Sequence, residues 1–212
     1  MQCCKRNNRH IWIFKISQIN VNTIGARTGT TVSVASGHTL QDANGNEISS
    51  GGLTLLHSST FTTVSSKSID SVFSSTYKNY KINLSILSSN TTDYMFRLRD
   101  GSGDVTTASY SWKYMYTIND ANWVAHTSGS NVNYVEYISA GGGNANHYNG
   151  IFEFFNPNTT DNTTFQWQGN RESRQMLMAA GGFAGSTQFT GITFYNTSNT
   201  ISGEIQIYGY AK

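Results

Sequence analysis

The sequence predicts an all-β protein: a jelly-roll-like antiparallel β-sandwich preceded by an N-terminal stem of extended and short-strand segments. Apolar and polar residues alternate with a period of two in many segments after residue 59, without a helical stripe of useful length. Clusters of Gly, Asn, Ser and Asp separate these segments at short intervals, as in sandwiches and barrels. Charged residues make up 12% and aromatic residues 13% of the chain, which argues against disorder and is unusual for a cytosolic enzyme.

The segment 80–86 has the clearest strand pattern, because its even positions are apolar and its odd positions are polar. Residues 94–99 repeat this pattern and end at a strong turn signal, 100–104. An Asn-Pro turn is expected after 155, and one helical turn is expected at 68–73, where Ser68 is a suitable cap. Further strands are expected at 112–118, 134–138, 151–155, 164–168, 175–179, 189–195 and 203–208.

The chain is expected to contain three zones. Residues 1–27 form an N-terminal attachment segment, residues 28–58 a short-strand linker or stem, and residues 59–212 the β-sandwich domain. The short strands at 30–34 and 53–56 cannot bury a core alone, so they need the main domain or neighbouring copies of the chain. A homotrimer would supply such neighbours. The candidates for lining its axis are Val32, Val34, Leu53 and Leu55.

Several segments carry a resemblance to a known class of proteins. Residues 28–40 resemble the strand-and-turn linkers of phage tail-fibre proteins. Residues 70–82, 96–103, 155–157 and 205–210 are similar, in this order, to β-sandwich domains of virion structural proteins of marine and cyanobacterial phages.

This resemblance implies a virion protein that is made in the host cytoplasm and acts outside the cell. Its N-terminal part would dock to other virion proteins, and its sandwich would recognise the host surface, with a cell-surface glycan as a candidate partner. Residues 1–20 depart from the pattern, and the docking candidates there are Trp12, Phe14 and Ile16. The alternative is a capsid decoration protein that binds the phage shell.

Aromatic residues are unusually frequent in this chain, and some of them are candidates for a binding function. Trp112, Tyr114 and Tyr116 share one face of their strand, which makes them either core residues or a stacking platform for sugar rings or a partner chain. Exposure distinguishes the two interpretations. The complete set of receptor or glycan contact candidates is Trp112, Tyr114, Tyr116, Asn119, Asp120 and Trp123.

The chain is expected not to be an enzyme and to use no cofactor. It has no paired-histidine metal motif, nucleophile elbow or Walker loop, and its Gly-rich segments do not open helices. A polysaccharide hydrolase would need two carboxylates about 5–10 Å apart. The acids that could supply them are Asp100, Asp104, Asp120, Glu136 and Glu153.

No metal site, nucleic-acid partner or membrane insertion is expected. Residues 42–46 imitate the start of a calcium loop but lack a distal Glu in register, and Cys3 and Cys4 have neither bridging nor metal-binding spacing. The net charge is only +2, so no basic face for nucleic acid is expected. No run approaches the roughly 18 apolar residues of a membrane span.

Overall fold

The structure, a computed structural model, describes residues 2–6, 9–13, 52–89, 93–117, 124–138, 147–171 and 175–211. The chain divides into two compact units, Met1–Ser49 and Ser50–Lys212. In the first unit, β1 (Gln2–Arg6) and β2 (Arg9–Ile13) pair as an antiparallel hairpin. The predicted strand at 30–34, including Val32 and Val34, lies outside the described residues.

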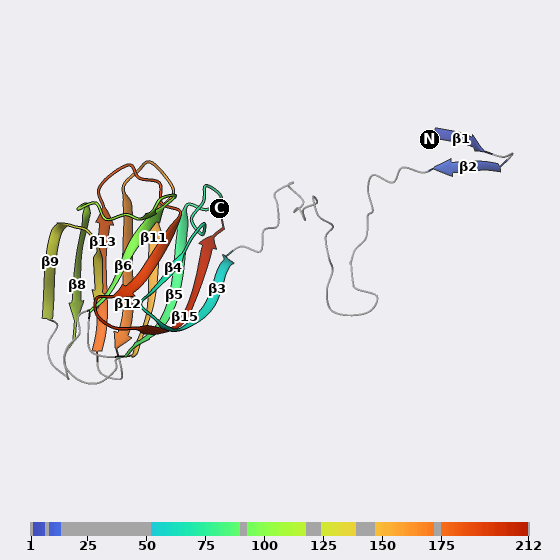
Figure 1. Ribbon diagram of the computed structural model, residues 1–212. Helices are drawn as coiled ribbons and strands as arrows, with labels where there is room; N and C mark the ends of the chain where they lie inside the picture. Colours follow the sequence, from blue (N-terminus) through green and yellow to red (C-terminus); the bar gives the residue numbers. More distant parts are fainter. Residues whose placement is uncertain are drawn as a thin grey trace. The chain divides into compact units, whose positions relative to one another are not determined.

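The second unit consists of two antiparallel sheets packed face to face, so the predicted all-β sandwich is confirmed (Figure 1). The large sheet has eight strands, with β3 and β9 at its opposite edges. Their spatial order is β3 (Leu53–Val64), β15 (Ile201–Tyr210), β5 (Asn79–Ser88), β11 (His147–Phe155), β12 (Thr163–Arg171), β13 (Gln175–Phe183), β8 (Tyr110–Tyr116) and β9 (Val124–Val132).

The small sheet has five strands and covers the inner face of the large one. The chain passes repeatedly between the two sheets, which gives the sandwich its jelly-roll-like character. Among the described residues, no helix has the length and apolar character needed to cross a membrane. The strands are β10 (Val135–Ile138), β6 (Tyr94–Asp100), β14 (Gly191–Asn196) and β4 (Ser66–Ile69), with β7 (Gly103–Asp104) paired to β6.

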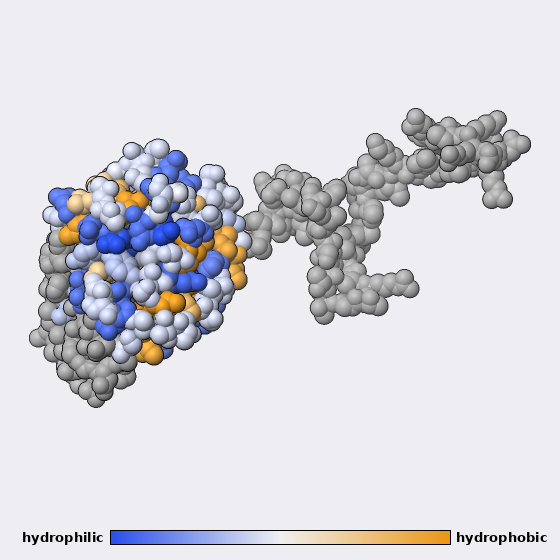
Figure 2. Space-filling model, viewed as in Figure 1, coloured by the Kyte–Doolittle hydropathy of each residue, from blue (hydrophilic) through white to orange (hydrophobic). Residues whose placement is uncertain are grey.

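An aromatic core fills the space between the sheets. The predicted inward positions of β5 and β6 are buried, which confirms the period-two reading of both strands. Phe96 is fully buried, with five aromatic rings at centroid distances of 5.3 to 6.3 Å. By contrast, the surface in Figure 2 is mainly hydrophilic, with separate small hydrophobic patches. The rings around Phe96 are Phe152, Phe154, Phe165, Trp167 and Phe194.

The predicted helical turn at 68–73 is wrong. Residues Ser66–Ile69 form β4, which pairs with β14, and the backbone amides of Val72 and Phe73 then donate to the Thr190 carbonyl at 2.9 and 3.1 Å. Val72 and Phe73 are buried in the core. Pairing with β14 therefore outweighs the local capping signal of Ser68.

The predicted boundary at residue 58 is also wrong, because β3 crosses it. Residues Leu53–Val64 pair with β15, so the sandwich begins near Ser50 and the segment 53–56 is part of a long strand. Residues 53–60 show no sustained alternation of their own. Their partner comes from the other end of the chain, so local sequence does not reveal the pairing.

Candidate functional site

Two of the predicted aromatic contact residues face the core. Trp112 and Tyr114 are 4% and 2% exposed, and their rings stack at 5.4 Å with an interplanar angle of 3°. The Tyr114 hydroxyl donates to the Glu136 carboxylate of β10 at 2.9 Å. Assigning Trp112 and Tyr114 to a receptor contact is therefore wrong, and the core interpretation holds for both. Tyr116 is half-buried on the same face, and Asn119, Asp120 and Trp123 lie outside the described residues.

The other predicted residues fall at the edge of the sandwich or outside it. Leu53 and Leu55 are 41% and 53% exposed on β3, beside Tyr210 and Tyr208 of β15. Their exposure is compatible with a contact between copies, and the trimer stays a prediction. Trp12 lies opposite Cys3 in the β1–β2 hairpin, whereas Phe14 and Ile16 are outside the described residues.

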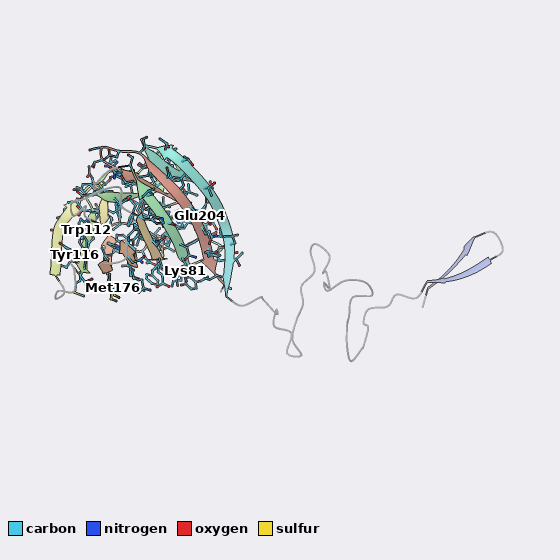
Figure 3. All side chains as sticks on the ribbon, turned by 90° about the horizontal axis from the view of Figure 1, so that it is seen from below. Lys81, Trp112, Tyr116, Met176 and Glu204 are labelled. Carbon is cyan, nitrogen blue, oxygen red and sulfur yellow. The ribbon has the colours of Figure 1, made fainter. Side chains whose placement is uncertain are left out.

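A groove of about 710 Å³ lies on the outer face of the large sheet. Its lining comes from β5, β11, β12, β13 and β15. The alternation that buries one face of each strand turns the polar positions outward into this groove. In Figure 3, Met176 and Lys81 lie toward the lower edge of the sandwich, and Trp112 lies farther from that edge. A second hollow of about 240 Å³ adjoins the groove and shares Lys81, Ile151, Gln168 and Met178 with it.

The strand register arranges the groove in rows that run across the strands. One row, called here the central row, crosses six neighbouring strands. Strands lie about 4.8 Å apart, so its five steps span about 24 Å. The residue order from β15 to β8 is Gln206, Asn83, Ile151, Gln168, Met178 and Met115.

A second row lies beside the central one and is polar over most of its length. Glu204, Ser85, Asn149 and Asn170 lie opposite one another on β15, β5, β11 and β12, and Met176 of β13 ends the row. The described residues of the groove thus include five amide side chains, contributed by both rows. Each amide offers both donors and an acceptor, so the two rows match a ligand rich in hydroxyl or amide groups.

A pair of glycines lies in the floor of the groove. Gly150 of β11 lies opposite Gly169 of β12, and both backbones line the groove. A side chain at either position would overlap the ring of Tyr148, which is buried against the inner side of the sheet. The missing side chains therefore let the Tyr148 ring pack flat beneath the groove.

The charges of the groove nearly cancel. Within the part of the chain that the structure describes, Lys81 and Glu204 are the charged side chains of the lining, and the adjoining hollow adds Glu153. The Tyr210 hydroxyl donates to Glu153, as does the Gln166 amide at 2.6 Å, and these bonds lower the pKa of the Glu153 carboxyl. Counting +1 from lysine and −2 from the glutamates gives −1 for both hollows. The site is therefore poorly suited to an anionic ligand.

Two methionines of β13 line the other end of the groove, and a third methionine lies beside them on β8. Met176 and Met178 of β13 are 60% and 48% exposed, and Met115 of β8, directly opposite Met178, is 46% exposed. Exposed thioethers in one patch make an apolar surface that can adapt its shape to a ligand. These three residues are called here the methionine wall.

Two described glutamates on this face, Glu153 and Glu204, have backbone positions far apart. Glu153 lies opposite Lys81, and Glu204 lies opposite Ser85, on the two strands that flank β5. The offset is about 13 Å along the strands and about 9.6 Å across them, so the two positions are roughly 16 Å apart. The two carboxyl groups of a glycosidase lie about 5–10 Å apart.

Other acids considered for hydrolysis are held in the small sheet. Arg99 forms an ion pair with Asp70 at 2.7 Å and a second one with Asp104, which also accepts a hydrogen bond from Thr193 at 2.6 Å. These contacts join β6, β7 and β14 on the outer face of the sheet. Asp100 accepts the Ser102 amide in the following turn at 2.7 Å. Within the described part of the chain, no group of three His, Cys, Asp or Glu side chains is placed to hold a metal ion.

The groove residues were not singled out from the sequence, although a signal for them exists. The groove-lining outward positions of β5, β11, β12 and β15 include three Asn and two Gln residues, although Asn is depleted in strands. Compared with protein-family models, with curated proteins and with solved structures, the chain gives no match.

Proposed function

We propose that this chain is a virion appendage protein of the tail-fibre type, in which the N-terminal part docks to the virion and the β-sandwich binds a glycan on the host surface. The low charge, the order of the zones and the resemblance to phage fibre and virion proteins support the virion context. The groove on the large sheet is the observation that carries the recognition role.

The groove has the properties that a glycan requires. Its volume of about 710 Å³ lies within the usual range of ligand sites. Sugar hydroxyls are both donors and acceptors, and the amides of Asn83, Asn149 and Gln168 can satisfy either role.

The spacing of the acidic residues in the groove and the adjoining hollow supports glycan recognition rather than glycan hydrolysis. The backbone positions of Glu153 and Glu204 are roughly 16 Å apart, whereas the two carboxyl groups of a glycosidase lie about 5–10 Å apart, so this spacing favours binding over cleavage of a glycosidic bond. The central row and the row beside it are much longer than a single glycosidic bond. An appendage that holds a surface polymer needs such an extended contact.

The proposed appendage is a homotrimer whose axis includes Leu53 and Leu55. Their exposure next to Tyr208 and Tyr210 supports a contact between copies at this end of the large sheet. Replacing Val32 and Val34 together by Asp should dissociate or unfold the assembly, because unpaired charges at a buried interface are costly. Sedimentation that finds a stable, folded monomer of the unmodified protein at micromolar concentration would contradict the trimer.

Binding of the purified full chain to immobilised bacterial lipopolysaccharide and capsule preparations tests the proposed function. We expect saturable binding that Gln168→Ala weakens, because Gln168 lies in the middle of the central row. The matched control is Gln188→Ala, which changes an exposed amide outside the groove. Equal binding by both variants, with unchanged circular dichroism, would contradict recognition through this groove. Labelling of intact virions on the capsid rather than the tail would favour the decoration alternative.

A further inference from the structure

We infer that the groove takes a neutral oligosaccharide with a methyl-bearing sugar, and that the methyl group lies against the methionine wall. The inference rests on the proposed glycan-binding function and adds the class of sugar and the direction in which the chain of sugars lies. Methyl-bearing sugars here are 6-deoxyhexoses and N-acetylhexosamines, which share this apolar substituent.

The two ends of the central row differ in chemistry. Gln206 and Asn83, on β15 and β5, offer hydrogen bonds, whereas Met178 and Met115, on β13 and β8, offer only apolar surface. A ligand that is polar along its whole length would leave its hydroxyls without partners at the methionine wall. A methyl substituent placed there would instead bury apolar area.

The length of the row requires more than one sugar. Asn83 and Met178 are three strand spacings apart, about 14 Å, which is wider than one sugar ring. Ile151 and Gln168 lie between them and supply an apolar contact followed by an amide. The oligosaccharide therefore crosses the strands, with its hydroxyl-rich end over β15 and β5 and its methyl-bearing sugar over β13.

The charge of the groove selects against acidic sugars. Among the described residues of the lining, Lys81 is the one cation, and both Glu204 and the neighbouring Glu153 would repel a carboxylate or sulfate. Recognition of a carboxylate is best served by a planar arginine fork, and no arginine lines the described groove. A neutral glycan avoids both the repulsion and an unpaired buried charge.

Titration calorimetry of the full chain tests this inference with four probes: chitotriose, a rhamnose trisaccharide, cellotriose and a hyaluronan hexasaccharide. Chitotriose carries N-acetyl groups, the rhamnose trisaccharide carries 6-deoxy methyl groups, cellotriose has no methyl group, and the hyaluronan probe is acidic. We expect at least one methyl-bearing probe to bind more tightly than cellotriose, by about fourfold for each methyl group that becomes buried. Whichever of the two binds more tightly identifies the source of the methyl group.

Variants separate the two ends of the row. Met178→Ala should remove the affinity advantage of the methyl-bearing probe over cellotriose, because it weakens binding of the methyl-bearing probe more than binding of cellotriose. Gln206→Ala should weaken both probes by the same factor, and Gln188→Ala should weaken neither. Circular dichroism of each variant checks that the fold is retained.

The outcomes distinguish this inference from the proposed function. Equal affinity for cellotriose and both methyl-bearing probes, or a preference for the hyaluronan hexasaccharide, would overturn the inference and leave glycan recognition standing. An advantage that survives Met178→Ala would also overturn it. Failure of every probe, together with failure of the polysaccharide preparations, would overturn the proposed function itself.

Discussion

Replacing Trp112 by Ala tests whether this residue stabilises the sandwich or contacts a ligand. A buried Trp removes about 150–250 Å² from water, and about 25 cal/mol per Å² gives roughly 4–6 kcal/mol for that burial. The indole nitrogen of Trp112 is buried without a hydrogen-bond partner among the described residues, a cost of about 1–3 kcal/mol that the variant no longer carries. Subtracting this cost from the burial term gives a net loss in unfolding free energy of about 1–5 kcal/mol, with a midpoint of about 3 kcal/mol.

Urea unfolding followed by circular dichroism measures this loss. Trp112→Phe should cost only about 1–2 kcal/mol, because it keeps a ring against Tyr114 and removes the unpaired N–H. The control Met176→Ala changes an exposed side chain and should stay within about 0.5 kcal/mol of the wild type. A Trp112→Ala protein that has the wild-type midpoint but loses glycan binding would refute the reasoning.

Three further predictions concern the rest of the sandwich. The pKa of Glu153 in the folded protein is below its ordinary value of 4.5, so the ionised side chain stabilises the fold above pH 4.5 and this stabilisation is lost as the pH falls through the folded pKa. Urea midpoints measured over a pH series should therefore decrease less steeply at acid pH for Glu153→Gln than for the wild type. An equally steep decrease in both proteins would contradict this prediction. Gly203→Ala would place a Cβ against a neighbouring backbone carbonyl and should lower the unfolding free energy by about 1–3 kcal/mol, measured by thermal unfolding. The control Gly101→Ala places its Cβ in open space and should leave the melting temperature unchanged. Equal melting temperatures of the two variants would contradict this prediction. Deleting residues 1–58 removes half of β3 and should lower the urea midpoint relative to deleting residues 1–49, and identical midpoints would restore the boundary expected from the sequence.

Strands with strict alternation were predictable from the sequence because burial of one sheet face imposes a period of two. The inward residues of β5 and β6 were assigned correctly, and the turns after Asp100 and Phe155 end their strands as expected. The full extent of β3 and the existence of β4 were not predicted. β3 and β4 are specified by partners far away in the chain, β15 and β14, so local propensity gave a linker and a helical turn instead.

The candidate site depended still more on tertiary structure. The alternation of Trp112, Tyr114 and Tyr116 established that they share a face, but the inward direction of that face depends on which sheet packs against it. The groove likewise needs β15, β5, β11, β12 and β13 to lie side by side in register, and a slip of one residue in a strand would turn its amides into the core. The sequence by itself therefore determined an all-β chain with one apolar and one polar face on each regular strand. Only the pairing of distant strands decided which polar faces meet, because that pairing sets which side chains become neighbours.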